Sequence, residues 1–332
     1  MTKRKIPKIQ HYVPQFILRN FCVGKTAQIC VFDKTNGSVF ISNIKNVAAE
    51  KGFYDLAIKD ITATLELSLS DLEGESSTIL NKIIEDGSLI NISNRDKKLL
   101  SFFFATQILR VPRIRQTYKQ MNNLMISIIE KMGYDPKEHP QILQDEEDFR
   151  TLSIGGMQEM APTLAPYFYS KDWILFKAPT DSSYYISDNP VTLTNQIDYR
   201  PNGSLGLAVK GIEIYFPISK SFSLGMICPS YKEMIDDNYG KLDFLKTCYE
   251  DQKLDIARDK IENIIKYKSC TETGFAFQSN LENVIYHNSL QVIRSSRFIF
   301  SEDDDFSLAK EMIEAHPEFR RQPQIHLHPR IK

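Results

Sequence analysis

The sequence has few cysteines and no long hydrophobic segment, which argues against a disulfide-stabilised fold and against a membrane-spanning protein. Its five cysteines are an odd number with no CxxC pair, in a chain of 332 residues that is large enough to fold without disulfides, so we expect reduced thiols. No segment approaches the roughly 18 consecutive apolar residues that cross a bilayer. The N-terminal MTKRKIPKIQ is basic but lacks the apolar run of a signal peptide. These absences predict a cytoplasmic protein with no membrane partner.

A strong charge of either sign is also absent. Lys and Arg number 41 and Asp and Glu number 42, which leaves a formal net charge of -1. Nothing in this balance attracts nucleic acid to the whole surface, so a nucleic acid or nucleotide partner would have to use a local patch. The sequence indicates no oligomeric state.

Several well-known site signatures are missing. The chain contains no GxxxxGK[ST], HExxH, GxSxG or GxGxxG, so phosphate-loop, zinc-protease, hydrolase-elbow and dinucleotide-binding functions are not supported. His326 and His328 have no third ligand close in sequence, and we expect a flexible tail there rather than a metal site.

The remaining composition is that of an ordinary globular protein with clear helix and strand patterns. With 42% hydrophobic and 25% charged residues, the chain can bury a normal core. Alternating residues on both sides of Asn36-Gly37 predict a hairpin with strands near 27–33 and 38–43. In HYVPQFILRNF, residues 11–21, Pro14 predicts the first turn of a short helix.

Helical periodicity dominates the middle of the chain. We expect one helix from Asp60 to the stop signal Gly87, and another that starts at a Ser93–Asp96 capping box. Pro112 must kink or restart this second helix. The segment EDFRTLSIGGMQEMAPTLAPYFYS predicts a further helix that is broken near Pro162 to Pro166.

From residue 172 the pattern changes to alternation, which predicts one antiparallel sheet over residues 172–228, followed by helices through 231–296 and a short closing strand, RFIFS. The predicted fold class is α+β: an N-terminal helix plus β-hairpin, a long helical layer, and an antiparallel sheet in the C-terminal half. We expect a single domain, 1–332. Its sub-parts are 1–60 (helix-hairpin unit), 61–170 (helical layer), 171–301 (sheet with returning helices) and 302–332 (C-terminal helix and tail).

An ordered series of motifs carries a family resemblance. The motifs are HYVPQFILRNF, LELSLSDLEGESSTIL, QILRVPRIR, YISDNPV, HNSL and RFIFS. Together they resemble the bacterial family called domain of unknown function 4238, over roughly residues 9–301. The resemblance implies an architecture and a set of positions, with Asn288 of HNSL among them, but no activity.

His11 and Gln15 are the first candidate site residues. Both are expected at the open end of the short helix, where His11 is either a hydrogen-bonded structural group or a general base or metal ligand. Glu66 and Glu73 are seven residues apart, so they point within about 20° of each other on a helix. They face either an interior cleft or solvent. Gly74 beside them hints at a close backbone approach.

Two further groups of polar residues are candidates. Arg110 and Arg113 flank Pro112, and their guanidinium groups would either pair with Glu66 and Glu73 or bind a phosphate. The second group, Ser187, Asp188 and Asn189, ends a strand. These three residues form either an Asx turn or part of a site.

Two functions of different classes follow. One is a phosphodiesterase or nuclease of a bacterial conflict or phage-defence system, for which a divalent metal is a candidate cofactor with no ligands assigned. Its catalytic residues would be His11, Glu73 and Asp188, and its substrate-binding residues Gln15, Glu66, Arg110, Arg113, Ser187, Asn189 and Asn288. The alternative is a non-catalytic binding or sensor protein whose polar motifs are structural.

One geometric prediction separates these functions. We expect His11 to point towards the Ser187-Asp188-Asn189 turn, so that an acceptor there fixes the imidazole tautomer and leaves the other ring nitrogen in a pocket. Convergence of His11, Glu73, Arg110 and Asp188 on one cleft would support a single catalytic site.

Overall fold

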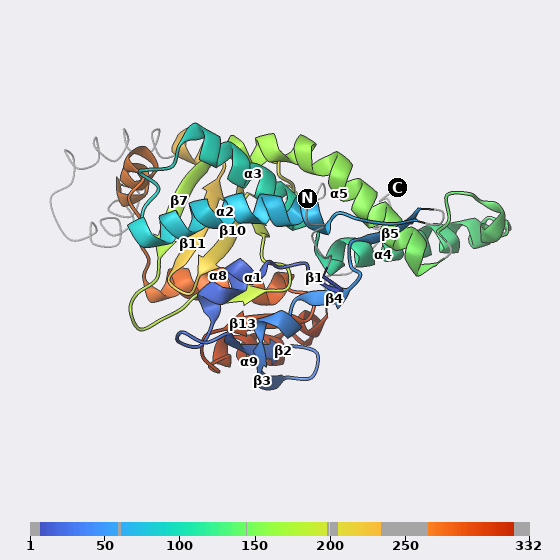
Figure 1. Ribbon diagram of the computed structural model, residues 1–332, viewed down its shortest axis with the longest axis horizontal. Helices are drawn as coiled ribbons and strands as arrows, with labels where there is room; N and C mark the ends of the chain where they lie inside the picture. The colour runs from blue at the N-terminus through green and yellow to red at the C-terminus, as the bar shows by residue number, and fades with distance from the viewer. Residues whose placement is uncertain are drawn as a thin grey trace, which may run out of the picture.

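The computed structural model describes residues 7–58, 61–143, 145–197, 199, 205–233 and 265–321, which form a layered fold (Figure 1). A helical layer lies across one face of a five-stranded sheet, and a four-stranded sheet lies at the opposite end of the molecule. The predicted α+β class is confirmed.

The N-terminal unit consists of short strands around one short helix. Strand β1 (Ile9–His11) pairs with β4 (Ala49–Lys51), and α1 (Gln15–Leu18) begins directly after Pro14. The predicted hairpin is confirmed as β2 (Gln28–Asp33) and β3 (Ser38–Asn43). Gly37 has a φ of 77° in the connecting turn, a conformation that glycine adopts without strain.

The prediction of a helix from Asp60 is wrong at its start. A second hairpin, β5 (Asp55–Ile58) with β6 (Ile61–Thr64), occupies these positions, and α2 (Glu66–Asp86) begins only after it. The sequence Ile-Thr-Ala-Thr of β6 is rich in β-branched residues, which favour a strand over a helix. The predicted stop at Gly87 is confirmed, with a φ of 58°.

The other predicted helices follow in order. Helix α3 (Asn94–Leu109) starts at the predicted capping box, in which the Ser93 hydroxyl and the Asp96 carboxylate each bond the other residue's backbone N–H. Helix α4 (Pro112–Lys131) is a restart, with Pro112 in its first turn.

Helix α5 (Glu146–Tyr169) corrects another expectation, because it runs unbroken through Pro162 and Pro166. Each proline removes one helical hydrogen bond. Extensive packing against α3 along the layer holds the helix together in spite of this loss.

The sheets divide the C-terminal strands differently from the prediction. The larger sheet has the order β12-β7-β11-β10-β9, with its long strands antiparallel as predicted. Its strands are β7 (Asp172–Lys177), β9 (Thr192–Asn195), β10 (Ile212–Ser219), β11 (Phe222–Ile227) and β12 (Phe277–Gln278). Strand β8 (Ile186–Ser187) leaves this sheet and pairs instead with β13 (Phe298–Ser301), in the order β3-β2-β13-β8. The prediction of a single antiparallel sheet over residues 172–228 is therefore wrong for β8.

The C-terminal elements pack on both sheets. Helix α8 (Leu281–Arg294) confirms the last of the helices expected in residues 231–296 but ends two residues earlier than expected, and α9 (Ser307–Ala315) follows β13. Most of the residues between Tyr231 and Tyr267, where we expected two helices, lie outside the described residues, as do His326, His328 and Cys248. The other four cysteines are free thiols, as predicted.

One buried hydrophobic cluster joins the parts of the fold. It contains Ile17 and Phe21 from the N-terminal unit, Phe104 from α3, and Ile174 and Phe216 from the larger sheet. Among the described helices, none has a stretch long and apolar enough to cross a membrane.

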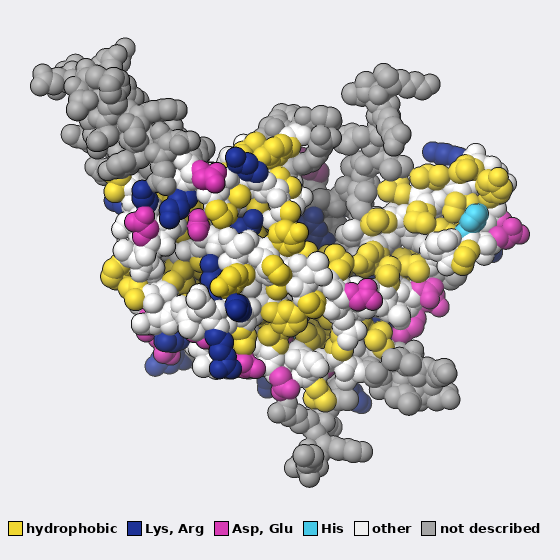
Figure 2. Space-filling view, turned by 90° about the horizontal axis from the view of Figure 1, so that it is seen from above, with side chains coloured by type: hydrophobic (Ala, Val, Ile, Leu, Met, Phe, Trp, Pro, Cys, Tyr) yellow, Lys and Arg dark blue, Asp and Glu magenta, His cyan; other side chains and the backbone are white. Residues whose placement is uncertain are grey.

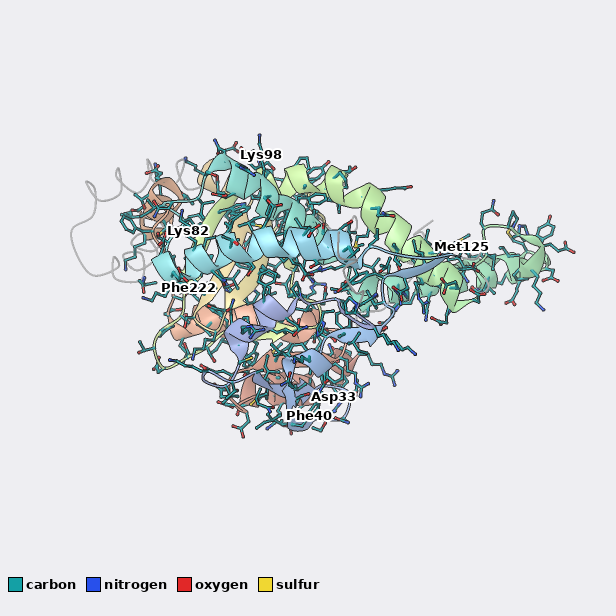
Figure 3. The ribbon with its side chains drawn as sticks, in the orientation of Figure 1. Asp33, Phe40, Lys82, Lys98, Met125 and Phe222 are labelled. Atoms are coloured by element: carbon teal, nitrogen blue, oxygen red, sulfur yellow. The ribbon has the colours of Figure 1, made fainter. Side chains whose placement is uncertain are left out.

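Helix α4 and the first turns of α5 form an arm at the side of the molecule (Figure 1). Hydrophobic side chains are gathered along this arm (Figure 2), and Met125 lies on it (Figure 3). Met121, Met125, Ile128 and Met132 are 40% to 66% exposed.

Candidate functional site

A pocket of about 290 Å³ opens between α1 and α2. From α2 it is lined by Glu66, Ser70, Glu73, Gly74 and Ser77, whose spacing places them on one helix face. His11, Gln15 and Phe16 line it from the N-terminal unit. The structure thus brings His11, Gln15, Glu66 and Glu73 together, although more than fifty residues of sequence separate the two groups.

His11 is held in one orientation by the backbone. Its Nε2 lies 3.1 Å from the carbonyl oxygen of Ile44, so this nitrogen carries the proton and donates it to the carbonyl. Its Nδ1 lies 3.5 Å from Nε2 of Gln15, which is a long and weak contact. Burial lowers the pKa of His11, although the Ile44 carbonyl and Glu73 act in the opposite direction. His11 therefore presents a neutral imidazole with an available Nδ1 lone pair.

The two glutamates of α2 lie in different surroundings. Glu73 accepts a hydrogen bond of 2.7 Å from Nη1 of Arg110, which is 3% exposed. Glu66 forms no ion pair among the described residues, and burial, followed by repulsion from Glu73, raises its pKa to about 7, although Arg110 acts in the opposite direction. A carboxyl group with a raised pKa beside an ion-paired carboxylate is typical of acid–base sites.

Arg110 also ties the pocket to the first motif of the chain. Its Nε donates to Oε1 of Gln107 at 2.7 Å, and Nε2 of Gln107 donates to the carbonyl oxygen of Tyr12 at 2.8 Å. Arg110 is therefore a buried ion-pair partner of Glu73 that also anchors the chain beside His11.

Gly74 does not mark a close backbone approach, so that expectation is wrong. A Cβ atom at this position would meet nothing within 4 Å. Because Gly74 lines the pocket, a side chain here would project into open space rather than into a neighbouring element.

The expected contact between His11 and the Ser187-Asp188-Asn189 turn is also wrong, since the Ile44 carbonyl takes its place. Asp188 is 2% exposed, and its carboxylate accepts from the backbone N–H groups of Ser296, Arg297 and Phe298 at 2.7 to 2.9 Å. Burial raises the pKa of Asp188, and these three donors offset part of that effect. The carboxylate thus fastens the turn to the start of β13.

The neighbours of Asp188 fasten the same region to α8. The Ser187 hydroxyl donates to Oε1 of Gln291, and Nδ2 of Asn189 donates to the carbonyl oxygen of Arg294. Asn288 accepts from the backbone N–H of Tyr185 at 2.7 Å and donates to the carbonyl of Ser183 at 2.9 Å. The YISDNPV and HNSL motifs therefore form one hydrogen-bonded network, which joins β8, α8 and β13.

Arg113 does not reach the glutamates of α2. Its Nη1 donates to the carbonyl oxygen of Arg294, and its side chain lines a different pocket together with Asn189. Four of the expected site residues thus line the α1–α2 pocket, and Arg110 contacts it through its ion pair with Glu73. The other five lie elsewhere: Arg113, Ser187, Asp188, Asn189 and Asn288. Within the described part of the chain, no three His, Cys, Asp or Glu side chains are grouped so that they could hold a metal ion.

Phe16, Ser70 and Ser77 also line the α1–α2 pocket, and Arg294 lines the pocket that contains Arg113; none of these four residues was predicted from the sequence as a site residue. The two serines lie four and eleven residues after Glu66, so helical spacing could have identified them. No local sequence signal distinguishes Arg294 from an ordinary surface arginine.

Comparison with known proteins identifies one family. The profile of the family described as "Protein of unknown function (DUF4238)" matches residues 9–305. No curated protein and no solved structure matches the chain. The matched region contains the HYVPQ and SDNPV motifs, which the structure places at the α1–α2 pocket and in the β8–α8–β13 network. The chain therefore belongs to the DUF4238 family.

Proposed function

We propose that this protein is a hydrolase that uses acid–base chemistry in the α1–α2 pocket, with phosphodiester bonds as its substrate class. The observation that carries the proposal is the convergence of His11, Glu66 and Glu73 on one open pocket. A phosphodiesterase or nuclease of this kind would take a nucleic acid or nucleotide as its partner and would suit a bacterial conflict or phage-defence system.

The charges in the pocket are compatible with a phosphodiester. Glu73 is paired with Arg110, His11 is neutral, and Glu66 is protonated below pH 7 because its pKa is about 7. With Glu66 protonated and Glu73 paired with Arg110, the described side chains of the pocket present no unpaired carboxylate. A singly charged diester can therefore enter without facing an unpaired carboxylate.

The proposal gives each group a role. Nδ1 of His11 takes a proton from water, whose oxygen attacks the phosphorus, while the Glu66 carboxyl group donates its proton to the leaving alcohol oxygen. His11 then returns its proton through solvent to Glu66, which restores both groups. The Ile44 carbonyl stabilises the imidazolium that forms in between, and Gln15 is placed to orient substrate or water.

The test is hydrolysis of bis(p-nitrophenyl) phosphate and of a labelled single-stranded oligonucleotide. Separate arms contain EDTA or added Mg²⁺ or Mn²⁺. We expect His11→Gln and Glu66→Gln each to lower kcat at least a hundredfold, since an amide cannot exchange a proton near neutral pH. The control is Glu75→Gln, an exposed carboxylate on the same helix.

A second variant tests the pocket without touching an acid or a base. Gly74→Leu would fill the pocket with a side chain, and replacing a helical glycine should not destabilise α2. We expect a folded protein with little activity. Full activity in Gly74→Leu, or in both amide variants, would overturn the assignment of the reaction to this pocket.

A non-catalytic binding protein is the second candidate, and one observation favours it. The side chains of Ser187, Asp188, Asn189 and Asn288 all bond backbone or side-chain groups of the fold, which is a structural use of the family motifs. An absence of turnover in every arm, combined with saturable binding of the oligonucleotide, would support this candidate over the hydrolase.

A further inference from the structure

A second pocket of about 290 Å³ lies where α4 begins and α8 ends. Arg113 and Arg294 line it together with Asn189. Its apolar wall comes from Ile114, Val191 and Leu193. None of the groups assigned to the α1–α2 pocket lines this second pocket.

Within the described part of the chain, the two half-buried arginines have no ion-pair partner. No described carboxylate forms an ion pair with Arg113 or Arg294. Among the described residues, Nε of Arg294 is buried without a hydrogen-bond partner, and Nη1 of Arg113 donates to the backbone carbonyl of Arg294. Asp188 attracts Arg113 electrostatically, but three backbone N–H groups already occupy its carboxylate.

This arrangement is unfavourable in the free protein. Burial lowers the pKa of both guanidinium groups, and the charge of Arg113 lowers that of Arg294 further. Partly buried like charges without an ion-pair partner destabilise a fold. An anion between them would remove this penalty.

The backbone adds to the positive potential. Arg113 and Ile114 belong to the first turn of α4, and no side chain caps this helix. The positive end of a 20-residue helix therefore lies at the pocket.

We propose that this pocket binds an organic phosphomonoester, with the phosphate held between Arg113 and Arg294 and an apolar or aromatic body against Ile114, Val191 and Leu193. A phosphomonoester carries about 1.5 to 2 negative charges at pH 7, which balances two guanidinium groups better than a single carboxylate does. The proposal does not depend on the hydrolase and concerns a separate site.

The experiment is calorimetric titration of the full chain at low salt with inorganic phosphate, phenyl phosphate and benzoate. We expect phenyl phosphate to bind most tightly, because it offers both the dianion and an apolar ring. Inorganic phosphate should bind more weakly, and benzoate should bind at least tenfold more weakly than phenyl phosphate. Arg294→Gln should weaken phenyl phosphate at least tenfold, whereas the exposed control Arg95→Gln should leave it unchanged. His11→Gln should also leave it unchanged, which separates this site from the α1–α2 pocket.

A second variant supplies the missing counter-charge from the protein. Thr117 lines the pocket one helical turn after Arg113, so Thr117→Glu places a carboxylate beside the arginines. We expect this variant to keep or raise the midpoint of urea unfolding and to lose phenyl phosphate binding. Ligand-free Arg294→Gln should likewise keep its unfolding midpoint.

Three results would overturn the proposal. One is no binding of phosphate or phenyl phosphate at millimolar concentration. Another is binding that Arg294→Gln and Thr117→Glu leave intact. The third is strong destabilisation of ligand-free Arg294→Gln, which would show that the guanidinium group already has a structural counter-charge.

Discussion

Replacing Glu66 by glutamine should stabilise the protein above pH 7 and have little effect below pH 5. In the folded protein the pKa of Glu66 rises from 4.5 to about 7, mainly through burial and then through repulsion from Glu73. The folded chain therefore keeps a proton that the unfolded chain loses between these values. The contribution of Glu66 to the free energy of unfolding therefore falls as the pH rises from 4.5 to about 7 and is constant above that range. Glutamine has no proton to lose, so the variant lacks this fall.

The size of the effect follows from the same pKa. A rise of about 2.5 in pKa corresponds to about 3.4 kcal/mol. Because part of the Glu66 carboxyl group faces solvent in the open pocket, screening reduces this to about 1 to 2 kcal/mol. The variant should gain this amount relative to the natural chain at pH 8.5 and almost nothing at pH 4.5.

Urea unfolding at half-unit steps between pH 4.5 and 8.5, followed by circular dichroism, measures the difference. The control is Glu75→Gln, which changes an exposed carboxylate on the same helix and should follow the natural chain at every pH. A Glu66→Gln curve parallel to that of the natural chain, or a loss of stability at pH 8.5, would refute the argument from burial and repulsion.

Three other predictions follow. Glu73→Gln should lower the free energy of unfolding by about 2 to 3 kcal/mol in urea titrations, because Arg110 is 3% exposed and loses its counter-charge; equal stability would contradict the buried ion pair. Asp188→Ala should cost about 3 kcal/mol or more, since three backbone N–H groups lose their acceptor. The folded fraction of this variant should still turn over substrate, because Asp188 does not line the α1–α2 pocket, and a folded but inactive variant would show otherwise. Limited proteolysis should cut first in the 134–142 connection of the arm and leave one folded body; two fragments that refold separately would contradict a single cooperative domain.

Local sequence signals determined much of the secondary structure. The Asn36-Gly37 hairpin, the capping box at Ser93 and the restart at Pro112 all depend on interactions within a few residues, and all are present as predicted. The α5 prolines show the limit of such reasoning, because packing against α3 outweighs a local helix-breaking preference.

The candidate site could be predicted only in part. Glu66 and Glu73 share a helix face, which helical spacing alone determines. The ion pair of Glu73 depends on Arg110, a buried cation from another helix, and the raised pKa of Glu66 depends on its burial beside Glu73. The acceptor for His11 likewise comes from Ile44, whose carbonyl no sequence motif marks.

The sequence by itself therefore determined the family, the α+β class and the residues available for chemistry. Tertiary structure decided which of those residues meet. It separated Asp188 and Asn189 from His11, used them to join β8, α8 and β13, and placed Arg113 beside Arg294. The physical reason is distance along the chain: hydrogen bonds within a turn or helix are set by neighbouring residues, whereas burial and charge pairing depend on segments that only the folded chain brings together.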